Sequence, residues 1–323
     1  MAEWLVEEGI AEHRAIRLDG ETIAEARVHW PGELLAGTVA EGVLVSRAAG
    51  SPRGTARFPS GAEALVDRLS PSAAEGSLIR LEITRPALAE QGRRKLARAR
   101  PTARPTASPD LVAQLRAEGH AVRTVRRFPA CDWDELIAEA FAGETSFPGG
   151  ALQFSPTPAM LLVDIDGTLA PRPLALAAVP ALASALRRFD VGGSIGIDFP
   201  TLPAKADRKA VDEALAEALA HWPHERTAMN GFGFVQLVAR LDRPSLLHRA
   251  AFHPAALAAR LVLRRAEALE GAGAILLTGH PAAEAALSPD SLAQLARRTG
   301  RQVRWAPNPA LALEVPQAQL VPL

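Results

Sequence analysis

Short runs in which apolar and polar residues alternate fill residues 1–88. Bounded by Gly and Pro, these runs include HRAIRLDG, TIAEARVHW, LAGTVAEGVLVSRA, GTARFPSG and SLIRLEITR. A period of two places every second side chain on one face of a strand. We therefore expect a small antiparallel barrel or sheet within residues 1–88.

A stretch rich in Pro, Ala and Arg follows at residues 91–109 and shows no apolar periodicity. This composition is typical of a basic linker. The next segment, residues 110–145, is short and mixed. Asp110 is placed to cap a helix that runs through Ala117, and residues 132–142 indicate a second helix.

Strand patterns alternate with helix patterns from residue 146 to residue 323. The strand-like runs include AMLLVDID, GGSIGIDF, GFGFVQLVARL, AGAILLTG and RQVRWA. Helices are expected over residues 174–188, 205–221, 254–270 and 290–299. Such alternation is typical of an α/β domain built on one sheet.

Composition limits the possible partners and compartments. Basic and acidic residues number 36 each, so any surface that attracts nucleic acid must be local. Cys131 is the single cysteine, which excludes an intramolecular disulfide framework and favours a reducing compartment. The acidic N-terminus has no signal-peptide pattern, and no apolar run reaches the length of a membrane span. These features predict a cytoplasmic protein with no membrane partner.

Two apolar runs end in carboxylates, Leu161–Gly167 and Ser194–Phe199. Side chains two residues apart share one face of a strand, so Asp164 and Asp166 point the same way. Ligands of α/β sheets bind at the carboxyl ends of the strands, where Asp198 from a second strand completes a cluster. Such carboxylates suit Mg²⁺. A strand-end Asp also commonly caps a helix or faces solvent, and spacing alone leaves both possibilities open.

One partial resemblance points to phosphatases. Residues Asp164–Leu169 resemble the first motif of the haloacid-dehalogenase phosphatases, in which the first Asp is a nucleophile. Residues Ile275–Gly279 resemble the second motif. No Lys follows Thr278, and Asp290 is the only later Asp, so this family stands as an alternative.

A longer, collinear series of segments resembles the ribonuclease E/G family. In that family the corresponding segments have sequences such as LPSGG, TEALTAIDVNSG, LRLRDLGGLIVIDF and VHPAVA. Here they are Phe147–Gly150, Ala159–Gly167, Leu186–Phe199, Ala210–Leu215, Gly231–Phe234, Arg243–Leu246 and Gly279–Ala282. Leu35–Pro86 is similar to the RNA-binding OB-type barrel of the same family.

This resemblance implies a shortened member of the family. It would have an N-terminal sheet segment over residues 1–34, an OB-type RNA-binding barrel over residues 35–90 and a C-terminal mixed-sheet α/β domain of the DNase I-like type over residues 146–323. It implies a metal-dependent endoribonuclease that acts on single-stranded RNA and leaves 5′-phosphate and 3′-hydroxyl ends. Asp164 and Asp198 occupy the positions that hold the catalytic Mg²⁺. Residues 110–145 would be a remnant of the family's 5′-end sensor. The family's zinc-binding cysteine pair is absent, so an oligomer, if formed, is not expected to be zinc-linked.

The chain departs from the family pattern at several positions. Asp166 stands where the family has an Asn that orients the first aspartate, and we expect it to join the metal ligands. Gly231 replaces an Arg, and Pro200 lies where an acidic residue often follows the second aspartate. These departures favour a second hypothesis, a non-catalytic RNA-binding homologue.

Aromatic and basic residues in three places are candidates for contact with RNA through stacking or phosphate binding. These are Phe58, Arg93, Arg94, Lys95, Arg240 and Arg243. Each has an ordinary alternative. The aromatic residue suits the barrel core, the basic run suits a solvated linker, and the two later arginines suit salt bridges.

Overall fold

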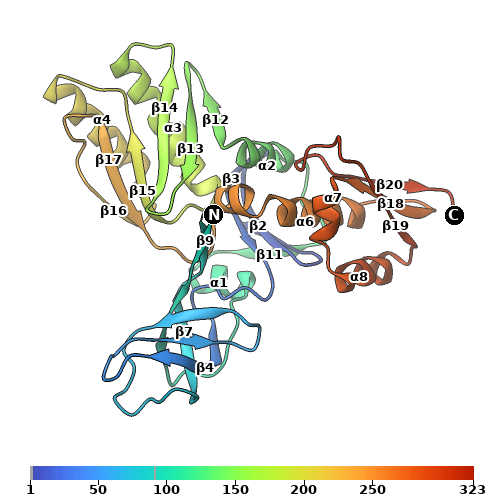
Figure 1. Ribbon diagram of the computed structural model, residues 1–323. Coiled ribbons are helices and arrows are strands. Elements are labelled where there is room, and N and C mark those ends of the chain that lie inside the picture. The colour runs from blue at the N-terminus through green and yellow to red at the C-terminus, as the bar shows by residue number, and fades with distance from the viewer. Residues whose placement is uncertain (1–2, 91) are drawn as a thin grey trace.

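The structure is a computed structural model that describes residues 3–90 and 92–323, with the side chains of Arg93 and Arg94 outside the description. Its strands form a four-stranded sheet, a closed barrel, a six-stranded sheet, a three-stranded sheet and a hairpin. In Figure 1 the barrel lies below the N-terminal sheet, and the six-stranded and three-stranded sheets lie to either side. The fold is mixed α/β with a small barrel, as predicted.

The N-terminal sheet takes its strands from two distant parts of the chain. Its order is β11 (Val122–Val125), β1 (Trp4–Glu8), β2 (His13–Asp19) and β3 (Thr22–His29). Because β1 pairs in parallel with β11, residues 110–145 complete the sheet that residues 1–34 begin. Helix α1 (Leu111–Ala117) contacts this sheet. Asp110 caps α1 as predicted, since its side chain accepts a hydrogen bond from the backbone N–H of Ala113 at 2.9 Å.

The barrel is closed by a strand that sequence analysis predicts as part of the linker. Its order is β10 (Ala97–Pro101), β6 (Glu63–Val66), β5 (Gly54–Arg57), β4 (Val39–Arg47) and β7 (Leu78–Arg85). The linker prediction is wrong here, because β10 pairs with both β6 and β7. Ala97 and Ala99 are buried while Arg98 and Arg100 are exposed. The segment is a half-buried strand whose inward side chains are only alanines.

The six-stranded sheet has helices on one face and solvent on the other. Its order is β12 (Glu144–Phe147), β13 (Gly150–Pro156), β14 (Leu161–Gly167), β15 (Gly193–Asp198), β17 (Phe234–Ala239) and β16 (His224–Arg226). Helix α3 (Pro171–Arg188) contacts β12, β13 and β14, and α4 (Lys205–Ala218) packs beside α3. Leu161, Val163 and Ile165 of β14 are buried, whereas the residues between them are exposed. We call the uncovered side the open face.

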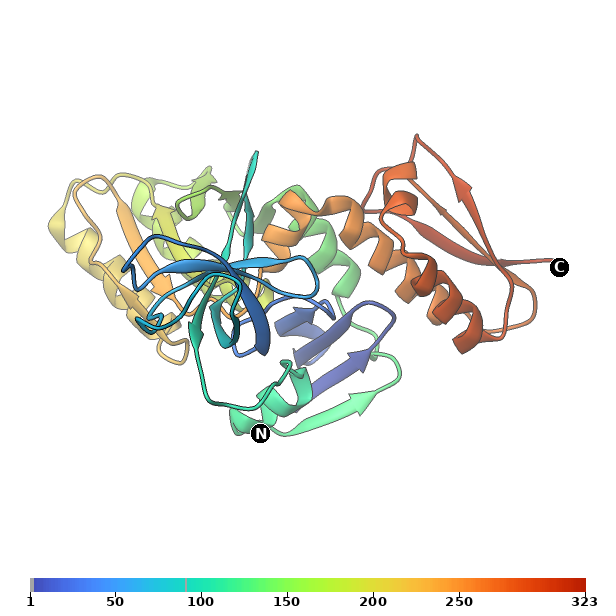
Figure 2. The same ribbon diagram turned by 60° about the horizontal axis from the view of Figure 1, so that its bottom comes forward.

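The last part of the chain forms a separate three-stranded sheet. Its order is β19 (Val303–Pro307), β18 (Ala274–Gly279) and β20 (Gln317–Val321). The associated helices are α6 (Pro254–Glu267), α7 (Pro281–Ala285) and α8 (Pro289–Thr299). A core around Val262, Ile275, Leu277 and Leu295 lies apart from the main core. Residues 146–323 therefore do not share one sheet, and α6 leads from one part to the other (Figures 1 and 2).

Two further helices complete the centre of the molecule. Helix α2 (Trp133–Ala142), predicted over residues 132–142, contacts α5 (Leu246–Phe252). The hairpin of β8 (Leu88–Glu90) and β9 (Arg93–Lys95) rises from the barrel, and β8 contacts α5 (Figure 1). No helix in residues 3–90 and 92–323 combines the length and apolar content needed to cross a membrane.

A buried cation joins the N-terminal sheet to α5. The Arg249 guanidinium donates hydrogen bonds to both carboxylate oxygens of Glu33, at 3.0 and 2.8 Å. Its carbon lies 4.0 Å from the ring centroid of Trp30, and the Arg260 guanidinium carbon lies 3.9 Å from the same ring. The Arg249 side chain has no exposed surface. This contact holds the loop after β3 against the helical centre.

Acid is expected to destabilise the N-terminal sheet through His29. Burial, followed by the neighbouring His13, lowers the pKa of His29 to about 4, and Glu33 partly opposes this shift. Arg243 and Arg249 add further repulsion. Between pH 6.5 and 4 the unfolded chain binds a proton that the folded chain does not bind, so stability falls as pH falls.

His29→Gln should therefore lose less stability than the wild type on acidification. Between pH 7 and pH 4.5, the fall in the free energy of unfolding should be smaller in the variant by roughly 2 kcal/mol. Urea denaturation followed by circular dichroism at the two pH values measures this difference. Equal losses in both proteins would contradict a neutral, buried His29.

Candidate active site

Two predicted site residues lie side by side in the six-stranded sheet. Strands β14 and β15 run in parallel, and their register makes Asp164 and Asp198 direct partners. Neighbouring strands lie about 4.8 Å apart, so both backbones present their carboxylates at one point. Both side chains are exposed on the open face. The prediction that they occupy adjacent strands of one sheet is confirmed.

Local sequence explains why these carboxylates share the open face. In Leu161–Gly167 the buried residues Leu161, Val163 and Ile165 face α3. They alternate with the exposed residues Leu162, Asp164 and Asp166. The backbone N–H of Ile165 donates to Asp164 Oδ1 at 3.0 Å, which orients that carboxylate. Within the described ranges neither partner aspartate forms a salt bridge with a basic side chain. Adjacent carboxylates without a cation repel each other and favour binding of a positive ion.

The predicted third ligand, Asp166, is not a strand partner of either aspartate of the pair. Asp166 lies on the same face of β14, but its strand partner is Ala151 of β13, since the β14–β15 register ends at Asp164 and Asp198. Among the residues that the structure describes, no group of three or more His, Cys, Asp or Glu side chains is arranged to hold a metal ion. The strand register therefore pairs Asp164 with Asp198, and Asp166 as a third ligand stays a prediction.

Apolar side chains border the pair on the open face. The register makes Phe234 of β17 the other strand partner of Asp198. A Cβ placed on Gly196 would lie 2.5 Å from Phe234 Cζ and 2.8 Å from Met160 Sδ, so these side chains cover the glycine. Leu162 is 37% exposed beside them. The sequence around Phe234 predicts only a motif match, because its pairing with Asp198 depends on the strand register.

Two of the residues predicted to contact RNA are structural instead. Phe58 is 3% exposed and belongs to the barrel core, so its ring cannot stack on a base. Arg243 is 5% exposed, and its guanidinium donates to Asp190 at 2.9 Å and to Gln114 at 2.8 Å. Both predictions are wrong. Phe58 packs among the aliphatic side chains of the barrel core, and Arg243 joins α1 to the loop after α3.

The other basic residues predicted to contact RNA differ in their surroundings. Arg240 is exposed and pairs with Asp242 at 2.7 Å, an arrangement that solvent and phosphate can compete for. Lys95 lines a crevice of about 300 Å³ between the β8–β9 hairpin and the start of β14 and β15. The side chains of Arg93 and Arg94 lie outside the described residues.

This crevice lies at the opposite end of the strands from the carboxylate pair. Leu161 and Ser194, at the start of β14 and β15, line it together with Arg85 from the barrel. Ser194 and Asp198 share a face of β15 and are four residues apart, which corresponds to about 13 Å along the strand. The open face thus runs from the barrel side of the sheet to the aspartates (Figure 1).

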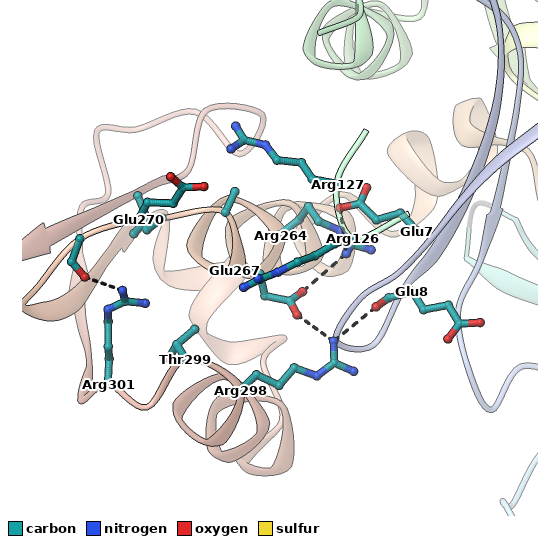
Figure 3. Close-up of a pocket in the computed structure, with 13 residues that line it drawn as sticks. Glu7, Glu8, Arg126, Arg127, Arg264, Glu267, Glu270, Arg298, Thr299 and Arg301 are labelled. Atoms are coloured by element: carbon teal, nitrogen blue, oxygen red, sulfur yellow. Dashed lines mark hydrogen bonds and ion pairs between the residues drawn. The ribbon is translucent and has the colours of Figure 1, made fainter. Parts of the chain in front are cut away.

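A larger cavity, of about 570 Å³, lies between the N-terminal and C-terminal sheets (Figure 3). It is lined by five arginines and four glutamates. Arg264 lies 3.2 Å from Glu7, and Arg298 lies 2.8 Å from Glu267. These ion pairs link β1, α6 and α8, so they connect the N-terminal sheet to the C-terminal sheet and its helices at this cavity.

The two segments that resemble phosphatase motifs lie in different sheets. Thr278 would have to lie beside Asp164 at one edge of one sheet, as both motifs serve the same substrate phosphate. Instead β18, which contains Thr278, belongs to the C-terminal sheet, and β14 belongs to the six-stranded sheet. The structure does not bring these two residues onto a common strand edge.

Among the described residues, the geometry favours the Asp164–Asp198 pair on the open face as the chemical candidate. Comparison of the chain with protein-family models finds no match, and comparison with curated proteins finds none. Function is accordingly inferred from the residues and their arrangement.

Proposed function

We propose that this chain is a shortened, divergent member of the ribonuclease E/G family that cleaves single-stranded RNA with Mg²⁺. The six-stranded sheet with α3 and α4 would be its DNase I-like domain, and the closed barrel its OB-type domain. The observation that carries the proposal is the direct pairing of Asp164 and Asp198 in parallel strands. Both positions match the family's metal-holding aspartates, and no basic side chain in the described ranges neutralises them.

The donor set suits a magnesium ion. Mg²⁺ is usually held by one or two carboxylates together with phosphate oxygens and water, so the pair suffices without a third protein ligand. Asp164 and Asp198 would hold the ion, which would supply positive charge to the phosphodiester and make water a better nucleophile. The hydrogen bond from the backbone N–H of Ile165 keeps the Asp164 carboxylate oriented before substrate binds.

The open face offers a path for one nucleic-acid strand. Lys95 and Arg85 line the crevice on the barrel side, where they suit contact with phosphates. Exposed Arg240 follows β17 at the same end. A strand bound there would reach the carboxylates along β14 and β15. A single strand would leave its bases accessible to the side chains of the uncovered face, whereas a duplex would hide them.

The main competing function is RNA binding without cleavage. The observation in its favour is the reduced site, with Gly231 and Pro200 at positions where the family carries charged residues and with Asp166 outside the pair. In that case the fold would retain the path for RNA while lacking a productive arrangement around the phosphodiester.

A cleavage assay tests the proposal. Purified protein is incubated with an unstructured RNA oligonucleotide labelled at its 5′ end, in Mg²⁺ or in EDTA. We expect Mg²⁺-dependent fragments that end in a 3′-hydroxyl. Fragments that persist in EDTA and end in a cyclic phosphate indicate a metal-independent contaminant. Binding without Mg²⁺-dependent cleavage would reject the nuclease and favour the binding homologue, and release of phosphate from a small phosphomonoester would favour the phosphatase.

A further inference from the structure

The most exposed Phe or Trp side chain among the described residues lies in the turn before β17, close in sequence to the strand partner of Asp198. Phe232 is 82% exposed. It precedes by two residues Phe234, the strand partner of Asp198. An aromatic ring left in water gives up the stabilisation that burial would provide, and its face stays accessible to a ligand.

The turn that carries Phe232 is held in place by its own hydrogen bonds. The Asn230 side chain accepts from the backbone N–H groups of Phe232 at 2.9 Å and Phe234 at 3.0 Å. The backbone N–H of Gly233 donates to Asn230 O at 3.2 Å. Met229, at the base of the turn, is buried, and its N–H donates to Asp212 at 3.1 Å. The ring is thus presented by an ordered turn.

The same turn is fastened to the residue that follows Asp198. The backbone N–H of Phe199 donates to Gly233 O at 3.2 Å. Gly233 has a φ of +92°, and a Cβ there would lie 2.4 Å from Phe199 O. Only glycine allows this close approach, so the position of Phe232 is coupled to the end of β15.

We propose that Phe232 stacks on a nucleobase of the single-stranded RNA next to the phosphodiester held at Asp164 and Asp198. This inference rests on the proposed function. Stacking suits a flat, rigidly placed ring in solvent, and every base offers a π-face to it. Unlike Phe58, which the barrel buries, Phe232 has the exposure that stacking needs. It also lies at the strand end where the phosphodiester would be held, so it would position the strand.

The test measures RNA affinity in EDTA, where the strand is not cut, with an unstructured oligonucleotide that carries 2-aminopurine at successive positions. Phe232→Ala should raise the Kd by about 5- to 150-fold, the value expected for one stacked base. Phe232→Trp should stay within about 3-fold of the wild type, since its ring also stacks. Quenching of 2-aminopurine at one position should disappear in Phe232→Ala. An abasic nucleotide at that position should make Phe232→Ala and wild type equal.

Leu323→Ala provides the matched control, because Leu323 is an apolar residue with 90% exposure at the far end of the chain. It should leave affinity unchanged, and circular dichroism should show that both alanine variants are folded. Wild-type binding that Phe232→Ala leaves intact would overturn the stacking role while sparing the proposed function. No RNA binding by the wild type would overturn both. Loss of a dimer in Phe232→Ala, with affinity per protomer unchanged, would make Phe232 a contact between copies and overturn stacking.

Discussion

Asp198→Asn is expected to lower Mg²⁺-dependent cleavage of single-stranded RNA by about 10³-fold or more. Removing one charged ligand weakens the hold on the ion, which supplies several kcal/mol of charge stabilisation at the phosphodiester. Asp164→Asn should have the same effect, because the two residues are partners in one strand register. The double variant should be no slower than either single variant, since each change already empties the site.

RNA binding separates this result from loss of folding. Both variants should bind the uncut oligonucleotide within a few-fold of the wild type, because most affinity comes from phosphate contacts elsewhere. Glu225→Gln is the matched control, since it removes an exposed carboxylate of the same sheet at β16, which lies beyond β17. Single-turnover rates and anisotropy titrations measure the two effects. Full cleavage by Asp198→Asn, or a phosphate covalently trapped on Asp164, would reject the metal-site assignment.

Asp166→Asn addresses the third aspartate separately. The register leaves Asp166 beside Ala151 and outside the carboxylate pair, and Asn is the residue that the resembling family has at this position. We expect the variant to cleave RNA at least as fast as the wild type. A loss as large as that of Asp198→Asn, in the same single-turnover assay, would restore Asp166 to the ligand set.

Arg249→Ala should strongly destabilise the fold without touching the candidate site. We expect the free energy of unfolding to fall by about 3 kcal/mol, the lower end of the range for breaking a buried ion pair. The side chain is fully buried, holds both oxygens of Glu33 and covers the ring of Trp30, so alanine leaves a cavity and an unpaired carboxylate. Urea denaturation followed by circular dichroism and tryptophan fluorescence measures the loss.

Two further variants serve as comparisons for Arg249→Ala. Arg249→Lys should lose less, because it keeps the charge but cannot form the two-pronged contact with Glu33. Arg53→Ala removes an arginine that also has an acidic partner, Asp67 at 2.9 Å, but whose side chain is 78% exposed. Its effect should stay below about 1 kcal/mol. If Arg249→Ala proved as mild as Arg53→Ala, the joint between the N-terminal sheet and α5 would not contribute as inferred.

Periodic patterns located most of the elements around the candidate site. The apolar runs that end at Asp164 and Asp198 indicated two strands, and the spacing of Asp164 and Asp166 put both on one strand face. The helix from Asp110 was found from its cap, a local hydrogen bond that one residue type and position specify. These features depend on neighbours within a few residues, so sequence alone carries them.

Residues 97–101 show where local pattern fails. Their alternation of Ala and Arg has too little apolar contrast to indicate a strand, and only the partners β6 and β7 make it one. The division of residues 146–323 into two sheets is likewise invisible locally, because a strand pattern does not specify its partner.

The sequence by itself determined most of the strand and helix positions around the site, the cap at Asp110 and the candidacy of Asp164 and Asp198. Only the tertiary structure decided that these two aspartates are direct partners, that Phe58 and Arg243 are buried, and that Phe232 is exposed in the turn before β17. The reason is physical. Burial and pairing depend on segments far apart in the chain, such as Arg249 and Glu33, whose contact no local periodicity encodes.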